Sequence, residues 1–95
     1  MSKSLTDMER ARQRAVMLGF TSVTALLAAR MKSDPDSANV RALRNVLSRG
    51  LRSRRSMVTA AKLFDVPPTF WLETDPVRVR AMIDAPAAST TAAAA

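Results

Sequence analysis

Apolar side chains recur every three or four residues through most of this chain, and this spacing predicts amphipathic α-helices. In the first segment Thr6 and Glu9 have the spacing of a capping box, which begins a helix, and Gly19 ends it. Arg10 and Arg14 are expected on the water-facing side of this helix. The apolar positions are Met8, Ala11, Ala15 and Leu18.

The second helix begins after a cap at Thr21 or Ser22 and ends in the polar turn 32–35, whose proline prevents continuation. A third helix, from about Ala38 to Arg49, follows a cap at Asp36 or Ser37 and stops at Gly50. One stripe of it is apolar, namely Val40, Leu43, Val46 and Leu47. The other side carries Asn39, Arg41, Ala42, Arg44, Asn45 and Ser48, and Arg and Asn are the side chains that bind guanine and adenine edges.

After a loop at 51–55, a fourth helix is predicted from near Ser56 to a point before Pro67. Residues 67–72 form a short helical turn that buries Phe70, Trp71 and Leu72, and a short last helix runs from an N-cap at Asp75 through Ile83. Because no alternating strand pattern occurs, the predicted class is all-α: a compact bundle of five short helices plus a short C-terminal helix. The predicted domain is 6–84, with disordered segments at 1–5 and in the Ala/Ser/Thr-rich stretch 85–95.

Positive charge is concentrated in one segment. The chain carries a net charge of +7, and the interval between Asp36 and Asp65 contains no acidic residue. Its basic residues number seven: Arg41, Arg44, Arg49, Arg52, Arg54, Arg55 and Lys62. Elsewhere acidic and basic residues cancel, so this segment holds the whole excess and is a candidate polyanion-binding surface. The alternative is a solvated basic face without a partner.

The composition also argues against several classes of protein. Without cysteine or histidine, the chain has no disulfides, no thiolate or imidazole metal ligands and no His-dependent catalytic triad. We therefore expect neither an enzyme nor a cofactor, and no small-molecule ligand is evident. No apolar run reaches the roughly 18 residues of a membrane span, and no signal core follows the N-terminus, so a cytoplasmic location is expected. Phe64, Phe70 and Trp71 could stack on single-stranded bases, but their apolar neighbours favour core packing.

Residues 63–71 read Leu-Phe-Asp-Val-Pro-Pro-Thr-Phe-Trp. This segment, after a helix that ends in Gly50, resembles the λ-repressor/Cro-like helix-turn-helix family, most closely regulators of actinobacteria and their phages. The resemblance covers about residues 7–72, with 22–31 as the first helix of the motif and 37–50 as the recognition helix. The turn between them is longer than is usual and has proline in place of glycine. The resemblance implies a sequence-specific double-stranded DNA-binding regulator, of the phage or prophage repressor type.

The two motif helices and the basic segment lead to a list of contacts. The helix 37–49 is expected to enter the major groove, with base contacts from Asn39, Arg41, Ala42, Arg44 and Asn45. Phosphate contacts are expected from Ser37, Ser48, Arg49, Arg52, Ser53, Arg54 and Arg55. A homodimer is expected through 75–83, although this helix could equally fold back onto its own chain. The alternatives are an architectural, excisionase-like DNA-binding factor and a protein-binding adaptor or antitoxin module.

Overall fold

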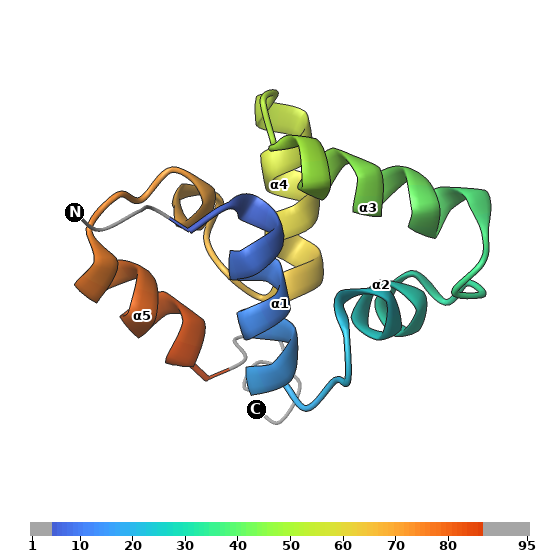
Figure 1. Cartoon of the computed structure of the whole chain (residues 1–95), viewed down its shortest axis with the longest axis horizontal. Coiled ribbons are helices and arrows are strands. Elements are labelled where there is room, and N and C mark those ends of the chain that lie inside the picture. Colours follow the sequence, from blue (N-terminus) through green and yellow to red (C-terminus); the bar gives the residue numbers. More distant parts are fainter. Residues whose placement is uncertain (1–4, 87–95) are drawn as a thin grey trace.

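The computed structural model describes residues 5–86, which form five α-helices and one 3-10 turn. The elements are α1 (Asp7–Met17), α2 (Val23–Met31), α3 (Ala38–Arg49), α4 (Arg54–Phe64), η1 (Pro68–Trp71) and α5 (Pro76–Asp84). Figure 1 shows α1 in the middle of the molecule, with α5 on one side of it and α2 and α3 on the other. No strand occurs among residues 5–86, and the predicted all-α class is confirmed. No helix in this part of the chain is long and apolar enough to cross a membrane.

The polar residues that precede the helices act as N-caps. Thr6 and Glu9 form the predicted capping box, in which the Glu9 backbone N–H donates to Thr6 Oγ1 at 3.1 Å and the Thr6 N–H donates to Glu9 Oε1 at 3.2 Å. Of the alternatives left open by the sequence, Ser22 caps α2 and Ser37 caps α3. Asp75 caps α5, whose first residue is a proline. Local sequence therefore determines where these helices begin.

The start of α4 differs from the prediction. The helix begins at Arg54 rather than near Ser56, because the Ser53 hydroxyl accepts a hydrogen bond from the Ser56 backbone N–H at 3.1 Å. Arg54 and Arg55 therefore belong to the first turn of a helix and not to a loop. The connection from α3 is reduced to residues 50–53, in which the buried Leu51 is the anchor.

The aromatic side chains form the centre of the core. The rings of Phe64 and Phe70 each meet the Trp71 ring edge-on, with centroid distances of 5.7 and 4.9 Å. All three are buried, which confirms core packing and leaves none of them free to stack on bases. Leu72 was predicted to be buried with them, but this is wrong, since its exposed fraction is 62%. The 3-10 turn ends at Trp71, and the following residue points outward.

The placement of Arg10 and Arg14 on the water-facing side of α1 is also wrong. Arg10 is 4% exposed and Arg14 is fully buried. The Arg14 guanidinium donates to the Phe64 and Asp65 carbonyls, each at 2.9 Å, where α4 ends. It also donates to carbonyls at the end of α5, those of Met82, Ile83 and Ala85. The last carbonyls of a helix lack intrahelical donors, and one guanidinium has enough N–H groups to serve two helix ends.

Arg10 makes similar contacts one helical turn earlier. Its guanidinium donates to the carbonyls of Leu5, Phe70 and Glu73. These two arginines therefore attach the chain from Phe64 onward to α1. Burial lowers the pKa of Arg14, and the carboxylate of Asp65 acts in the opposite direction.

Helix α5 lies against α1 and buries Val79 and Ile83 there. This part of the predicted dimer interface 75–83 is thus used for packing within the chain, whereas Val77 on the outer side is 76% exposed. The disordered segments predicted at 1–5 and 85–95 fall outside the described residues except for Leu5, Ala85 and Pro86. Leu5 packs against the core, and the Ala85 carbonyl accepts a hydrogen bond from Arg14.

Candidate nucleic-acid interface

Helices α2 and α3 cross steeply: in Figure 1 α3 runs across the page while α2 is seen nearly end-on. The turn between them contains no glycine, and Lys32 takes the left-handed conformation at the end of α2, with φ of 54°. The Ser33 N–H then donates to the Ala28 carbonyl at 3.0 Å, and the Ser37 N–H donates to the Asp34 carbonyl at 2.9 Å. A tight reversal is thus formed although proline stands where a glycine was expected.

Helix α3 is held by one narrow stripe. Val40 and Leu47 are buried, Leu43 and Val46 are partly buried, and the helix packs on α1 and α2. The other side is exposed over the whole length of the helix. All five predicted base-contact residues, Asn39, Arg41, Ala42, Arg44 and Asn45, are exposed.

These five residues are not equivalent. At about 100° per residue, a line directly opposite the buried stripe passes through Ala38, Ala42, Asn45 and Arg49. Arg41 and Ser48 lie beside this line, whereas Asn39 and Arg44 lie at its two edges, nearer the core. We call the residues on or beside the line the reading face: Ala38, Arg41, Ala42, Asn45, Ser48 and Arg49. The sequence analysis missed Ala38, although the same helical spacing identifies it.

A contact from α1 fixes the far end of α3. Gly50 has φ of 100°, a conformation in which side-chain-bearing residues are strained, and it turns the chain away from the helix axis. The next backbone N–H, that of Leu51, donates to the Asp7 carboxylate at 2.6 Å. Asp7 therefore joins the start of α1 to the junction between α3 and α4. Sequence analysis could not find this contact, because the two residues are 44 positions apart.

Replacement of Asp7 by alanine is expected to lower the free energy of unfolding by about 1–3 kcal/mol, because it leaves the partly buried Leu51 N–H without an acceptor. Urea unfolding of the Asp7→Ala variant measures the change. Asp36→Ala is the control, since Asp36 is exposed and has no hydrogen bond within residues 5–86. Equal stability of the two variants would show that the contact does not hold the junction.

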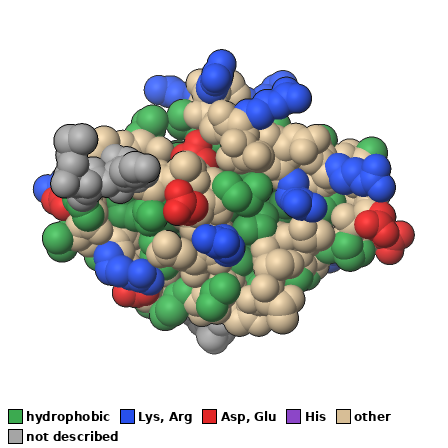
Figure 2. All heavy atoms as spheres, in the orientation of Figure 1, with side chains coloured by type: hydrophobic (Ala, Val, Ile, Leu, Met, Phe, Trp, Pro, Cys, Tyr) green, Lys and Arg blue, Asp and Glu red, His purple; other side chains and the backbone are tan. Residues whose placement is uncertain are grey.

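Four arginines surround this junction: Arg49, Arg52, Arg54 and Arg55, which we call the arginine cluster. All four are exposed, and none forms an ion pair within residues 5–86. Arg49 and Arg52 line an open depression of about 460 Å³, together with Val46, Gly50, Ser53 and Ser56. Figure 2 shows Lys and Arg side chains along the upper edge of the molecule, over the α3–α4 junction, and further ones over α3. The structure therefore brings the predicted cationic residues onto neighbouring parts of one surface.

Arginines elsewhere in the fold behave differently. Arg30 pairs with Asp65 at 3.0 Å, and Arg80 pairs with Asp84 at 2.8 Å. The hydrogen bond from Arg80 lowers the pKa of Asp84. Arg78 lies 3.8 Å from a Glu73 oxygen. Arg12 on α1 is exposed and unpaired as well, but within residues 5–86 exposed, unpaired guanidinium groups gather on the α3–α4 side of the molecule.

The serine residues predicted to contact phosphate divide into two kinds. The hydroxyl oxygens of Ser37 and Ser53 accept hydrogen bonds as N-caps, and the Ser53 hydroxyl also donates to Ser56 Oγ at 2.9 Å. Ser48 is exposed on the reading face, and its hydroxyl makes no hydrogen bond within residues 5–86. Of the three, Ser48 therefore has a hydroxyl that is not already used by the fold.

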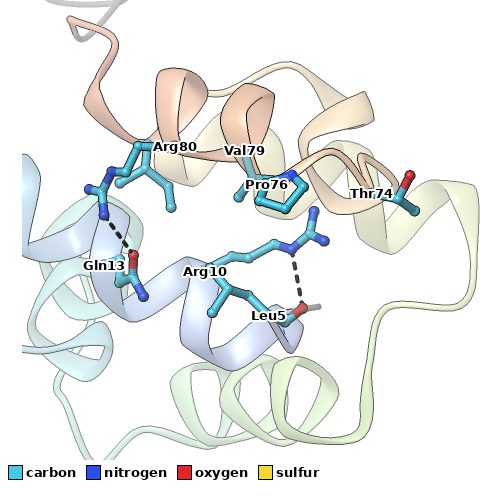
Figure 3. A pocket seen from close by; sticks show the side chains of 8 residues that line it. Leu5, Arg10, Gln13, Thr74, Pro76, Val79 and Arg80 are labelled. Carbon is cyan, nitrogen blue, oxygen red and sulfur yellow. Dashed lines mark hydrogen bonds between the residues drawn. The ribbon is translucent and has the colours of Figure 1, made fainter. Parts of the chain in front are cut away.

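A small cavity of about 90 Å³ lies between α1 and α5, on another part of the molecule. Figure 3 shows Arg80 reaching Gln13 across its rim, with a hydrogen bond of 3.2 Å, and Arg10 turned toward the Leu5 carbonyl. Ligand pockets are commonly 300–1,000 Å³, so this space is small for an organic ligand. The cavity is part of the contact between α1 and α5.

We compared the chain with protein-family models, with curated proteins and with solved structures, and none of the three comparisons finds a match.

Proposed function

We propose that this protein binds double-stranded DNA sequence-specifically, with α3 in the major groove. The observation that carries the proposal is the placement of unpaired arginines. They lie along the exposed side of a helix that is fixed by its opposite, apolar side, and they continue around the α3–α4 junction. An α-helix fits the major groove, where base edges present distinct donors and acceptors.

The reading face has suitable chemistry for base contacts. Arg41 can donate two hydrogen bonds to guanine, and Asn45 can pair with adenine. Ala38 and Ala42 have small side chains, so the middle of α3 can approach the base edges closely, and the Ala42 methyl can contact a thymine methyl. Asn39 and Arg44, at the edges, are better placed for the groove walls.

The arginine cluster supplies sequence-independent attraction. Its guanidinium groups form no ion pair within residues 5–86, so phosphates can take up their donors without breaking one. Arg54 and Arg55 lie in the first turn of α4, where backbone N–H groups also favour an anion. By contrast, the exposed Asp34 and Asp36 precede α3, so phosphate contacts are expected to be strongest at the C-terminal end of α3.

The resemblance of residues 63–71 to λ-repressor/Cro-like regulators extends the proposal to transcription: the protein would act as a repressor that occupies promoter DNA. Selection of bound duplexes from a random pool, followed by titration of the selected and scrambled duplexes, tests the binding step. We expect the selected duplex to bind at least about 10³-fold more tightly at physiological salt. Equal affinity for both duplexes would indicate that the protein is an architectural factor that binds DNA independently of sequence. Absence of binding to either would overturn the proposal and favour an acidic protein partner.

Replacement of Arg41 by alanine is expected to weaken binding to the selected duplex by about 1–3 kcal/mol, because one base contact is lost. Fluorescence anisotropy with selected and scrambled duplexes measures the effect, which should be much smaller for the scrambled one. Lys62→Ala is the matched control, since Lys62 is exposed on α4 beyond the arginine cluster. An equal loss for both duplexes would mean that Arg41 contacts phosphate and not a base.

A further inference from the structure

The side chains of α3 that point directly away from the core differ between the two halves of the helix. The line opposite the buried stripe passes through Ala38 and Ala42 in the first half and through Asn45 and Arg49 in the second. An alanine methyl group has no hydrogen-bond donor or acceptor. On this line, the side chains that can bond to a base edge therefore lie in the C-terminal half of α3.

The charges at the two ends of α3 favour the same half. The turn before the helix, residues 32–36, carries Lys32, Asp34 and Asp36, a net charge of −1, and both carboxylates are exposed. At the other end Arg49 is exposed and forms no ion pair within residues 5–86, and the exposed Arg52 follows it. Because phosphates repel carboxylates and attract guanidinium groups, the C-terminal end of α3 is drawn more closely to DNA.

We propose that α3 reads DNA with its C-terminal half and that Arg49 contacts a base rather than a phosphate. This inference rests on the proposed function. It reverses the usual docking of a helix-turn-helix, in which the N-terminal residues of the recognition helix contact the base edges. It also changes the expectation from the sequence, which placed Arg49 and Ser48 among the phosphate contacts.

The fold holds the end of α3 in place for this role. A side chain in the last turn of a helix can select a base only if that turn is fixed. The hydrogen bond of 2.6 Å from the Leu51 N–H to the Asp7 carboxylate fixes the chain two residues beyond Arg49. Arg49 is therefore the last residue of a helix whose end is attached to α1.

The neighbours of Arg49 leave it available for a base. The Ser48 hydroxyl, one residue earlier on the reading face, makes no hydrogen bond within residues 5–86 and can bond to an adjacent base. The chain turns away from the helix axis at Gly50, which has φ of 100°, and the other members of the arginine cluster follow this turn. Those members, Arg52, Arg54 and Arg55, can bind the phosphates at the edge of the groove, so Arg49 is not needed there.

Helical spacing predicts how far apart the two base contacts are. Asn45 and Arg49 are four residues apart, which is about 6 Å along the axis of α3 at 1.5 Å per residue. Base pairs follow one another every 3.4 Å or so, about two within this length. Asparagine pairs with adenine and arginine with guanine. The preferred DNA site is therefore expected to contain an adenine and a guanine about two base pairs apart.

The two asparagines of α3 provide the first test. Asn39 and Asn45 are both exposed, so either can be replaced by alanine without loss of the fold, which circular dichroism checks. Asn45→Ala is expected to weaken binding to the selected duplex about 5- to 150-fold, because a base contact is lost, whereas Asn39→Ala should have a much smaller effect. Fluorescence anisotropy titrations measure both affinities.

Arg49 is tested against Arg52, an exposed arginine beyond the end of the helix. Arg49→Ala should weaken binding to the selected duplex about 5- to 150-fold and to the scrambled duplex much less. Titrations with single base-pair substitutions should show that this variant loses its preference at one position, about two pairs from the position that depends on Asn45. Arg52→Ala should weaken binding to both duplexes equally and reduce the slope of log K against log salt concentration by about 0.9.

Two results would overturn the inference while leaving the proposed function intact. In the first, Asn39→Ala loses more preference between bases than Asn45→Ala does. In the second, Arg49→Ala weakens binding to the selected and scrambled duplexes equally, as a phosphate contact would. In both cases the wild type still prefers the selected duplex. A wild type that does not distinguish the two duplexes would overturn the proposed function, and this inference with it.

Discussion

Replacement of Arg14 by alanine is expected to lower the free energy of unfolding by about 3–5 kcal/mol, a large part of the 5–15 kcal/mol typical of a small domain. The guanidinium is fully buried and serves backbone carbonyls where both α4 and α5 end. Without it, several buried acceptors lose their donor at once, and each such loss is costly. Urea unfolding, followed by the fluorescence of Trp71, the single tryptophan, measures the effect.

The same helix offers the control. Arg12 is exposed and its guanidinium makes no hydrogen bond or ion pair within residues 5–86, so Arg12→Ala removes an equal charge at little expected cost. Arg14→Lys should recover only part of the stability. The planar guanidinium group has donors that reach the ends of both α4 and α5, whereas the compact ammonium group of lysine has fewer donors and cannot bond to both helix ends. Hydrogen exchange should rise first in α5 of the Arg14→Ala variant. Equal stability of Arg12→Ala and Arg14→Ala would show that the buried contacts contribute little.

Joint replacement of Arg52, Arg54 and Arg55 by glutamine is expected to weaken DNA binding about 10²-fold at 0.15 M salt, in cognate and random duplexes alike. Each phosphate contact contributes about 0.9 to the slope of log K against log salt concentration, so three lost contacts reduce the slope by nearly three. Anisotropy titrations over a range of salt concentrations give both quantities.

A triple variant of Arg12, Arg78 and Arg80 to glutamine is the matched control. Both triple variants reduce the net charge from +7 by three to +4, and all six arginines are exposed. If the two variants lost the same affinity and the same slope, net charge alone would explain binding, and the arginine cluster would not be a site. A loss confined to the first variant locates the phosphate contacts at the α3–α4 junction.

The two predictions concern arginine residues in opposite environments, one in the core and the others on the surface. Arg10 and Arg14 on α1 are buried and hydrogen-bonded to backbone carbonyls, whereas the arginines around the α3–α4 junction are exposed and form no ion pair within residues 5–86. An arginine whose donors are already used cannot bind DNA, so the count of basic residues overstates the cationic surface. Location in the fold decides which of them are available.

The sequence by itself determined the local features of this protein. The helix boundaries at Thr6, Ser22, Ser37 and Asp75 depend on side chains that bond to backbone only a few residues away, and the all-α class follows from the apolar spacing. The exposed side of α3 was predictable for the same reason, because its apolar stripe is regular. The predicted start of α4 was two residues too late. Ser53 and Ser56 are both suitable N-cap residues, and Ser53 is the cap because its hydroxyl accepts a hydrogen bond from the Ser56 backbone N–H and donates one to the Ser56 hydroxyl.

Only the tertiary structure decided what depends on contacts between distant segments. The burial of Arg10 and Arg14 requires carbonyls that lie 50 to 71 residues further along the chain, and the Asp7–Leu51 contact spans 44 residues. The exposure of Leu72 and the burial of one side of α5 likewise follow from how η1 and α5 return to α1. A charged or apolar residue carries no local sign of the partner that folding brings to it, and for that reason the sequence could propose the reading face of α3 but not the Asp7–Leu51 contact that fixes the end of this helix.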